Sequence, residues 1–127
     1  MLLSEAPVNV MIRITNHDTT RAFYKDTLGL KHIDLGPNIP AIFEAGNGTR
    51  IIAYTGEPTH PAHTVGAFTV SDIQKTVTEL KDKGVVFEEY DLPDIELKTV
   101  DGIATSAGNK SAWFKDPDGY IWAINQM

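Results

Sequence analysis

The chain has 127 residues, 42% of them hydrophobic, no cysteine and a formal net charge of −6. The lack of cysteine excludes disulfides and thiolate chemistry, and the acidic balance argues against binding to a nucleic-acid backbone. No apolar run approaches the roughly 18 residues that a membrane helix needs, and residues 1–7 lack the basic region of a signal peptide. We therefore expect a single cytoplasmic domain over residues 1–127, with neither nucleic acid nor membrane as a partner.

The first half of the chain is predicted to form a strand, a helix and three further strands. A β-branched, apolar run predicts a strand over residues 8–14. Asn16 offers an N-cap for a helix over 19–28, which would turn Ala22 and Phe23 toward the core before Gly29 ends it. Strands over 30–35, 39–44 and 50–55 follow, and Gly46-Asn-Gly is a hairpin signal between the last two.

The second half repeats this order after a linker over residues 56–63 that is rich in proline and glycine. A strand is predicted over 64–70, and Ser71-Asp-Ile-Gln has the capping-box pattern, with Ser71 as the N-cap of the next helix. After a strand over 85–90, residues 91–108 are predicted to be a long irregular loop of the kind that often forms a lid. Strands over 111–115 and 120–125 are joined by a turn at residues 116–119.

Two segments of the chain are similar enough to indicate an internal repeat. Residues 41–54 align with residues 112–125 without a gap, which places Ile52 on Ala123. Each segment reads as a strand, a glycine turn and a second strand. Repeated supersecondary units usually pack against each other. We therefore expect a cavity between the two halves of the chain.

Two motifs carry a resemblance to a known family. Residues 23–30 read Phe-Tyr-Lys-Asp-Thr-Leu-Gly-Leu, and residues 114–120 read Phe-Lys-Asp-Pro-Asp-Gly-Tyr. In this order and spacing, and with the repeat, the chain resembles the vicinal oxygen chelate superfamily of glyoxalase I, bleomycin-resistance proteins, fosfomycin-resistance enzymes and extradiol dioxygenases. The resemblance covers nearly the whole chain. It implies an α+β fold of tandem βαβββ modules, about residues 7–55 and 64–126, forming an incomplete barrel with the helices on the outer face, and a homodimer.

The resemblance also indicates where a metal would bind. Metal-dependent members hold a divalent ion through His, Glu or Gln at symmetric strand positions, which fall here on Asn9, Ile52, Val65 and Ala123. Three of these side chains are hydrocarbon, and the fourth is a single neutral donor. A divalent ion needs three or four N, O or S donors. We therefore expect no metal and no cofactor, and we do not expect metal-dependent glyoxalase or dioxygenase activity.

Strand alternation predicts which side chains line the cavity, because every second residue of a strand faces the same side. The predicted ligand pocket consists of Asn9, Met11, Arg13, Ile52, Tyr54, Val65, Ala67, Trp113, Ile121, Ala123 and Asn125. The position of Arg13 resembles the one at which glyoxalases hold a carboxylate of their thiol substrate. Arg13 therefore either binds an anionic group or pairs with an acidic residue at the rim. Trp113 is either a stacking wall for a ligand or part of the core.

Two main functions remain open from the sequence. The first is a binding module, resembling the bleomycin-resistance proteins, that holds a small, partly apolar molecule in a metal-free concave groove. The alternative is an enzyme of the lyase, isomerase or dioxygenase class that uses Glu88 or Tyr90 as an acid or base, or a metal bound outside the family pattern by His32, His60 or His63. Glu88 and its neighbour Glu89 point to opposite faces of a strand and cannot act as a carboxylate pair. A third interpretation is a dimerising domain with a vestigial pocket.

Overall fold

The computed structural model describes residues 3–36 and 40–127. The chain divides into two compact units, Met1–Thr59 (unit 1) and His60–Met127 (unit 2), and their boundary lies within the predicted linker. Ile39, the first residue of one predicted strand, lies outside the described residues. In the described part of the chain, no helix is long and apolar enough to cross a membrane.

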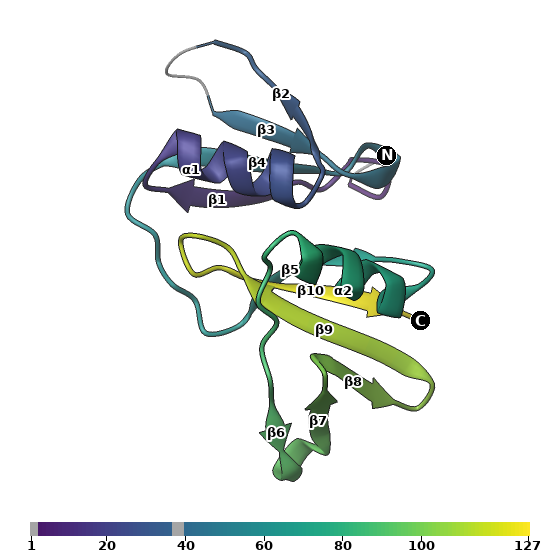
Figure 1. Ribbon diagram of the computed structural model, residues 1–127. Coiled ribbons are helices and arrows are strands. Elements are labelled where there is room, and N and C mark those ends of the chain that lie inside the picture. The colour runs from purple at the N-terminus through teal and green to yellow at the C-terminus, as the bar shows by residue number, and fades with distance from the viewer. Residues whose placement is uncertain (1–2, 37–39) are drawn as a thin grey trace. The chain divides into compact units, whose positions relative to one another are not determined.

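Unit 1 is a four-stranded sheet with a helical segment on one face (Figure 1). The strand order is β1-β4-β3-β2, with β1 parallel to β4 and the other pairs antiparallel. The strands are β1 (Val10–Ile14), β2 (Lys31–Ile33), β3 (Ala41–Glu44) and β4 (Arg50–Thr55). The 3₁₀ turn η2 (Gly46–Gly48) closes the β3–β4 hairpin, as the glycines predict. The buried core of the unit consists of Ile12, Ile14, Tyr24, Phe43, Ile51 and Ala53.

The helical segment of unit 1 combines α1 (His17–Arg21) with a π-helical turn, η1 (Ala22–Thr27). The Asn16 side chain caps it as predicted, by accepting a hydrogen bond from a backbone amide of the first turn at 2.9 Å. In the wider turn, the backbone N of Leu28 donates to the carbonyl of Phe23 at 2.9 Å. Tyr24 is fully buried whereas Ala22 is exposed. The expectation that Ala22 faces the core was therefore wrong.

Unit 2 is a six-stranded sheet with one α-helix on one face (Figure 1). The strand order is β5-β10-β9-β8-β7-β6, with β5 parallel to β10 and the remaining pairs antiparallel. The elements are β5 (Thr64–Thr69), α2 (Ile73–Asp82), β6 (Asp91–Leu92), η3 (Pro93–Ile95), β7 (Leu97–Val100), β8 (Ile103–Ser106), β9 (Asn109–Lys115) and β10 (Ile121–Gln126). The apolar stripe of α2 packs over β9 and β10. The core includes Ile73, Val77, Val85, Phe87, Ala112, Phe114, Trp122 and Ile124.

The N-cap of α2 is Asp72 and not Ser71. The Asp72 carboxylate accepts a hydrogen bond from the backbone N of Lys75 at 3.1 Å. The two neighbouring residues are both suitable capping types, and the helix begins one residue later than the capping-box pattern predicts. Gly84 follows the last turn with φ +95°, in the left-handed conformation that suits a glycine after a helix.

The prediction of an irregular loop over residues 91–108 was wrong. These residues contain the strands β6, β7 and β8. The strand expected over 85–90 is reduced to one bridge between Phe87 and Phe114. The alternation of polarity in β7 is inverted, since Thr99 is buried while Val100 is 66% exposed. That pattern hides the strand from sequence reasoning. The α+β architecture with two βαβββ modules is confirmed, and β6 and β7 are an addition at the edge of the second.

The internal repeat is confirmed in the strand pairing. In the β3–β4 hairpin Phe43 lies opposite Ile51, and in the β9–β10 hairpin Phe114 lies opposite Trp122. These four residues are equivalent in the gapless alignment of the two segments. The register of one hairpin therefore reproduces the register of the other.

Candidate functional site

The open face of the unit 1 sheet carries the first group of predicted pocket residues. Since β1 and β4 are parallel, Met11 lies opposite Ile52 and Arg13 opposite Tyr54, and the four side chains share the face away from the buried core. The Nε of Arg13 lies 3.4 Å from the hydroxyl oxygen of Tyr54. Asn9 is exposed and directly precedes β1. This face therefore combines apolar surface with one guanidinium group and one phenol.

The face of the unit 2 sheet opposite to α2 carries the second group. Ala67, Ala123 and Trp113 lie side by side on the adjacent strands β5, β10 and β9. Trp113 is half-buried, and its ring meets the ring of Tyr90 edge-on, with 5.4 Å between the centroids. A large aromatic side chain thus stands beside two side chains of one methyl group each. The other predicted residues lie along the same strands, namely Val65, Ile121 and Asn125.

Two residues of β9, one on either side of Trp113, form polar pairs with residues outside the strand. The Ser111 hydroxyl donates to Oδ1 of Asn125 at 2.8 Å. The Nζ of Lys115 lies 3.4 Å from Oε1 of Glu88. Sequence reasoning missed Ser111 and Lys115, although their two-residue spacing from Trp113 places them on its face.

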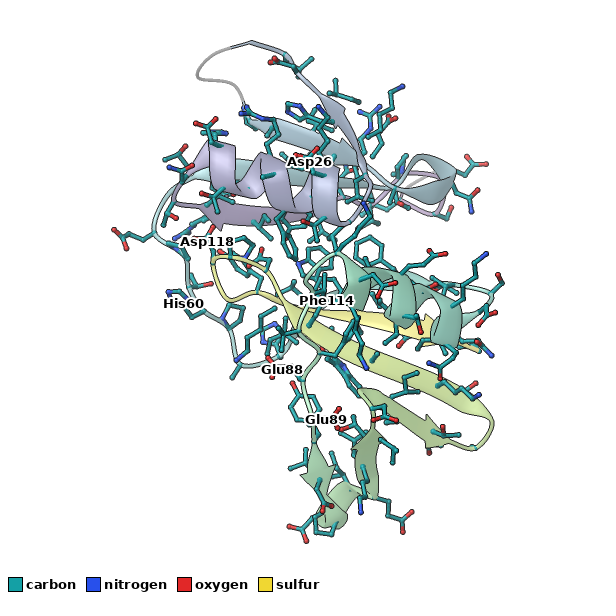
Figure 2. The ribbon with its side chains drawn as sticks, in the orientation of Figure 1. Asp26, His60, Glu88, Glu89, Phe114 and Asp118 are labelled. Atoms are coloured by element: carbon teal, nitrogen blue, oxygen red, sulfur yellow. The ribbon has the colours of Figure 1, made fainter. Side chains whose placement is uncertain are left out.

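The adjacent Glu88 and Glu89, both labelled in Figure 2, have separate partners. Glu88 forms the ion pair with Lys115, while Oε2 of Glu89 accepts a hydrogen bond from the Thr99 hydroxyl at 2.7 Å. They lie on the connection between α2 and β6, outside any regular strand. A shared proton between the two carboxylates is therefore not part of this site.

The pKa of the Tyr90 phenol is raised on this face. Burial raises the pKa of its phenol above the ordinary value of 10.0, the negative charge of Glu88 raises it further, and Lys115 opposes both effects. The phenol is therefore protonated at neutral pH. In that state Tyr90 can donate a hydrogen bond or a proton, but it cannot serve as a base.

The positions of the family's metal ligands do not fit a divalent ion. Ile52 lies beside Met11 in unit 1, and Ala123 lies beside Ala67 in unit 2. The predicted ligand positions therefore offer three hydrocarbon side chains and the single neutral amide of Asn9. Within residues 3–36 and 40–127, no group of three or more His, Cys, Asp or Glu side chains could hold a metal ion. The donor chemistry at these positions is wrong for a hard or borderline cation.

The histidines considered as ligands outside the family pattern have other neighbours. His32 stacks on Phe43, with 5.2 Å between the ring centroids, on the core side of its sheet. His60 adopts φ +47°, and its Nδ1 lies 3.1 Å from the position that a Cβ on Gly119 would occupy (Figure 2). His63 is exposed.

A hollow of about 440 Å³ lies elsewhere in unit 2. Its lining comes from the start of α2, from β7 and β8 with their connecting turn, and from β9. None of the predicted pocket residues takes part. The lining residues are Ile73, Gln74, Lys98, Val100, Asp101, Ile103, Thr105 and Lys110. Most of them belong to the segment predicted as a loop, so sequence reasoning missed the hollow.

Comparison with known proteins gives a family and a fold. The model of the Glyoxalase/Bleomycin resistance protein/Dioxygenase superfamily matches residues 7–124. No curated protein matches the chain. The fold is similar to that of TnmS3, an antibiotic binding protein from Streptomyces sp. CB03234, with TM-score 0.73 and 18% identity over 99% of this chain and 98% of that one. A putative glyoxalase family protein from Bacillus anthracis gives TM-score 0.72 and 19% identity, covering 96% of this chain and 94% of that one.

Proposed function

The chain belongs to the Glyoxalase/Bleomycin resistance protein/Dioxygenase superfamily, and on that premise we propose that it binds a small, partly apolar organic molecule without a metal. The candidate contact residues lie on or beside one sheet face within each unit: in unit 1 they are Asn9, Met11, Arg13, Ile52 and Tyr54, and in unit 2 they are Val65, Ala67, Trp113, Ile121, Ala123 and Asn125. The family includes members that bind their ligands and members that transform them, so the choice depends on the chemistry of these faces.

One observation carries the proposal, the position of Trp113 beside Ala123 and Ala67. The indole forms an aromatic wall. Ala67 is exposed, whereas Ala123, on the strand between Ala67 and Trp113, is buried, at 4% exposure. A flat or apolar group can rest on Ala67 and pack against the ring. The edge-on contact with Tyr90 holds the indole in place, so little side-chain entropy is lost on binding.

Polar groups around this apolar surface would orient the ligand. In unit 2 they are the Ser111–Asn125 pair and the Lys115–Glu88 pair. On the sheet face of unit 1, taken by itself, the guanidinium of Arg13 can bind an anionic group through its several N–H donors. A mainly apolar surface with a few well-placed polar groups is typical of sites for small molecules.

The metal-free part of the proposal is supported by the side chains at the family's ligand positions. Ile52, Val65 and Ala123 cannot donate an electron pair, and Asn9 alone would bind a divalent ion weakly. Elemental analysis of the chain purified without an affinity tag tests this. A transition metal bound in a one-to-one ratio would contradict the proposal.

Binding to the Trp113 face can be tested by thermal shift with planar aromatic compounds that range from neutral to singly anionic. A compound present at 100 times its Kd should stabilise the native state by about 2.7 kcal/mol and raise Tm. Trp113→Leu should weaken binding by about tenfold, because it removes the aromatic contact.

Phe68→Leu is the matched control, since Phe68 is half-buried and packs on Trp122, away from the open face. It should lower stability without changing the Kd. A screen in which no compound stabilises the protein, or in which the two variants lose affinity equally, would refute the proposal.

The antibiotic binding protein TnmS3 shares this fold, which supports a binding role of this kind. The proposal also includes a cytoplasmic homodimer, as the resemblance to the family implies. Light scattering of the purified chain would test the mass of a dimer, and cell fractionation would test the compartment.

A second candidate function is an enzyme in which Tyr90 donates a proton. Its support is the protonated phenol beside Trp113, with Glu88 and Lys115 near enough to affect its pKa. Tyr90→Phe should then reduce turnover of a compound found in the screen by about 100-fold or more, while its Kd changes little. If mass spectrometry detects no conversion by the unmodified protein, the enzyme hypothesis is rejected.

A further inference from the structure

We propose that the hollow between α2 and the β7–β8 hairpin is a second binding site, one for a monocarboxylate with a short apolar tail. The site is independent of the Trp113 face. Its lining supplies positive charge, hydrogen-bond donors and an apolar wall within a single unit of the chain.

The strand ladder places this hollow on the face of the sheet opposite to Trp113. Thr99 pairs with Ala104, and Ala104 pairs with Ser111, so these residues share one face with Trp113. Their neighbours along β7, β8 and β9 point to the other face, because side chains alternate along a strand. Those neighbours line the hollow, and α2 lies on the same side. A ligand in the hollow therefore cannot contact the indole of Trp113.

The hollow exists because α2 covers only part of its sheet. The helix packs on β9 and β10, while β8 and β7 extend the sheet beyond it. Val100 consequently remains 66% exposed although it lies on a strand. The Nζ of Lys81, in the last turn of α2, donates to the carbonyl oxygen of Asp101 at 3.1 Å. This bond ties the helix to the β7–β8 turn and helps to keep the wall of the hollow in position.

The charge of the lining is opposite in sign to that of the protein. Lys98 and Lys110 line the hollow, and neither has an ion-pair partner among the described residues. Asp101 is the one acidic residue in the lining, so the set carries one net positive charge, whereas the whole chain has a net charge of −6. Thr105 and Gln74 add a hydroxyl and an amide that can donate hydrogen bonds. This combination favours an anion, because unpaired ammonium groups gain from a carboxylate partner.

The apolar side chains of the lining specify the rest of the ligand. Val100 and Ile103 supply the accessible apolar part of the lining, and Ile73, which is 1% exposed, lies beneath them. A volume of about 440 Å³ is within the range of small-molecule sites. Acetate would leave the apolar wall in water, and a dicarboxylate would bring a second negative charge near Asp101. The set therefore fits a singly charged carboxylate with a tail of several carbons.

The test is a titration of the full-length chain with sodium octanoate, followed by amide NMR shifts. We expect saturable shifts at residues 73–74, 98–105 and 110. Octanamide, which lacks the charge, and acetate, which lacks the tail, should each bind at least about tenfold more weakly. Lys98→Gln and Lys110→Gln should each weaken octanoate binding by about threefold or more, as expected for partly exposed charge contacts.

Two variants act as controls. Lys25→Gln removes an exposed lysine of unit 1 and should not change octanoate affinity. Trp113→Leu should also leave it unchanged, so that failure of this proposal and failure of the proposed ligand face are distinguishable. The inference is overturned if octanamide binds as tightly as octanoate, if the shifts map to residues around Trp113, or if the titration does not saturate. Dispersed spectra of every variant would establish that each one is folded.

Discussion

The indole of Trp122 lies against the backbone of Gly66 on the neighbouring strand. A Cβ built on Gly66 would be only 2.5 Å from Cζ3 of Trp122, closer than real Cβ atoms approach other atoms. The indole cannot easily withdraw, since Trp122 is 2% exposed and packs on Phe68 with 5.4 Å between the ring centroids. Glycine at this position therefore makes room for the largest side chain of the core.

We predict that Gly66→Ala destabilises the protein by about 1–3 kcal/mol, because overpacking forces the indole or the strand to shift. Urea unfolding, followed by circular dichroism, measures the change. Gly46→Ala is the control, since no atom lies within 4 Å of the Cβ that it would add and its φ is not positive. Equal urea midpoints for the two variants would show that the close contact with Trp122 does not exclude a side chain at position 66.

Asp72 and Ser71 differ in their contribution to α2. We expect Asp72→Ala to lower the free energy of unfolding by about 1 kcal/mol, because the backbone N of Lys75 loses its acceptor. Ser71→Ala should change it by less than about 0.5 kcal/mol, as at an ordinary surface position. Thermal unfolding of both variants provides the comparison. A larger loss of stability in Ser71→Ala than in Asp72→Ala would indicate that Ser71 is the N-cap.

Asp116 organises the β9–β10 turn. It is 6% exposed, and its Oδ1 accepts hydrogen bonds from the backbone N of Asp118 at 3.0 Å and of Tyr120 at 2.9 Å. We expect Asp116→Ala to cost about 1–3 kcal/mol, because it leaves these amides without their acceptor. Asp116→Asn, which retains an acceptor oxygen, should recover part of the loss in denaturant melts. Asp94→Ala, at an exposed position in η3, should have little effect.

The raised pKa of Tyr90 makes stability depend on pH in the alkaline range. Below the ordinary pKa of 10.0 the stabilising contribution of the protonated phenol is fully present. It is lost as the pH rises through the higher pKa of the folded state, since the unfolded chain then releases the proton first. Tyr90→Phe should therefore unfold with a smaller fall in stability above pH 10 than the unmodified chain. Tyrosinate absorbance during the titration follows the ionisation. If the free energy of unfolding falls equally steeply with pH in both proteins, Tyr90 is not the group responsible.

Local patterns in the sequence were sufficient to predict both hairpins and their equivalence. Strand alternation and the glycine turns are encoded within a few residues, so residues 41–54 could be matched with residues 112–125, which form the two equivalent hairpins. The same alternation placed Met11 and Arg13 with Ile52 and Tyr54 on one face. Whether these side chains bind a ligand remains a prediction.

The segment after α2 could not be predicted from local patterns. In β7 the buried residue is Thr99 and the exposed one is Val100, which is the reverse of the usual order. The hydroxyl of Thr99 is accommodated because it bonds to Glu89 and to the backbone of Tyr90. These partners lie outside β7, so the alternation within the strand does not reveal them. The hollow lined by Lys98 and Lys110 was missed for the same reason.

The π-helical turn shows the same limit on a smaller scale. The helix pattern predicted Ala22 and Phe23 toward the core, but the wider turn that begins at Ala22 buries Tyr24. Its ring packs on Phe43, with 5.3 Å between the centroids. A π-helical turn is a response to tertiary packing, and the 3.6-residue period does not predict it.

The position of β6 and β7 at the margin of the unit 2 sheet has an evolutionary consequence. An outermost strand has one neighbour, so its length and side chains can vary while the pairing of β9 with β10 is retained. Mutations in this margin would reshape the wall that contains Lys98 and leave the Trp113 surface intact. The margin of the sheet can therefore change in evolution without altering the hairpin that carries Trp113.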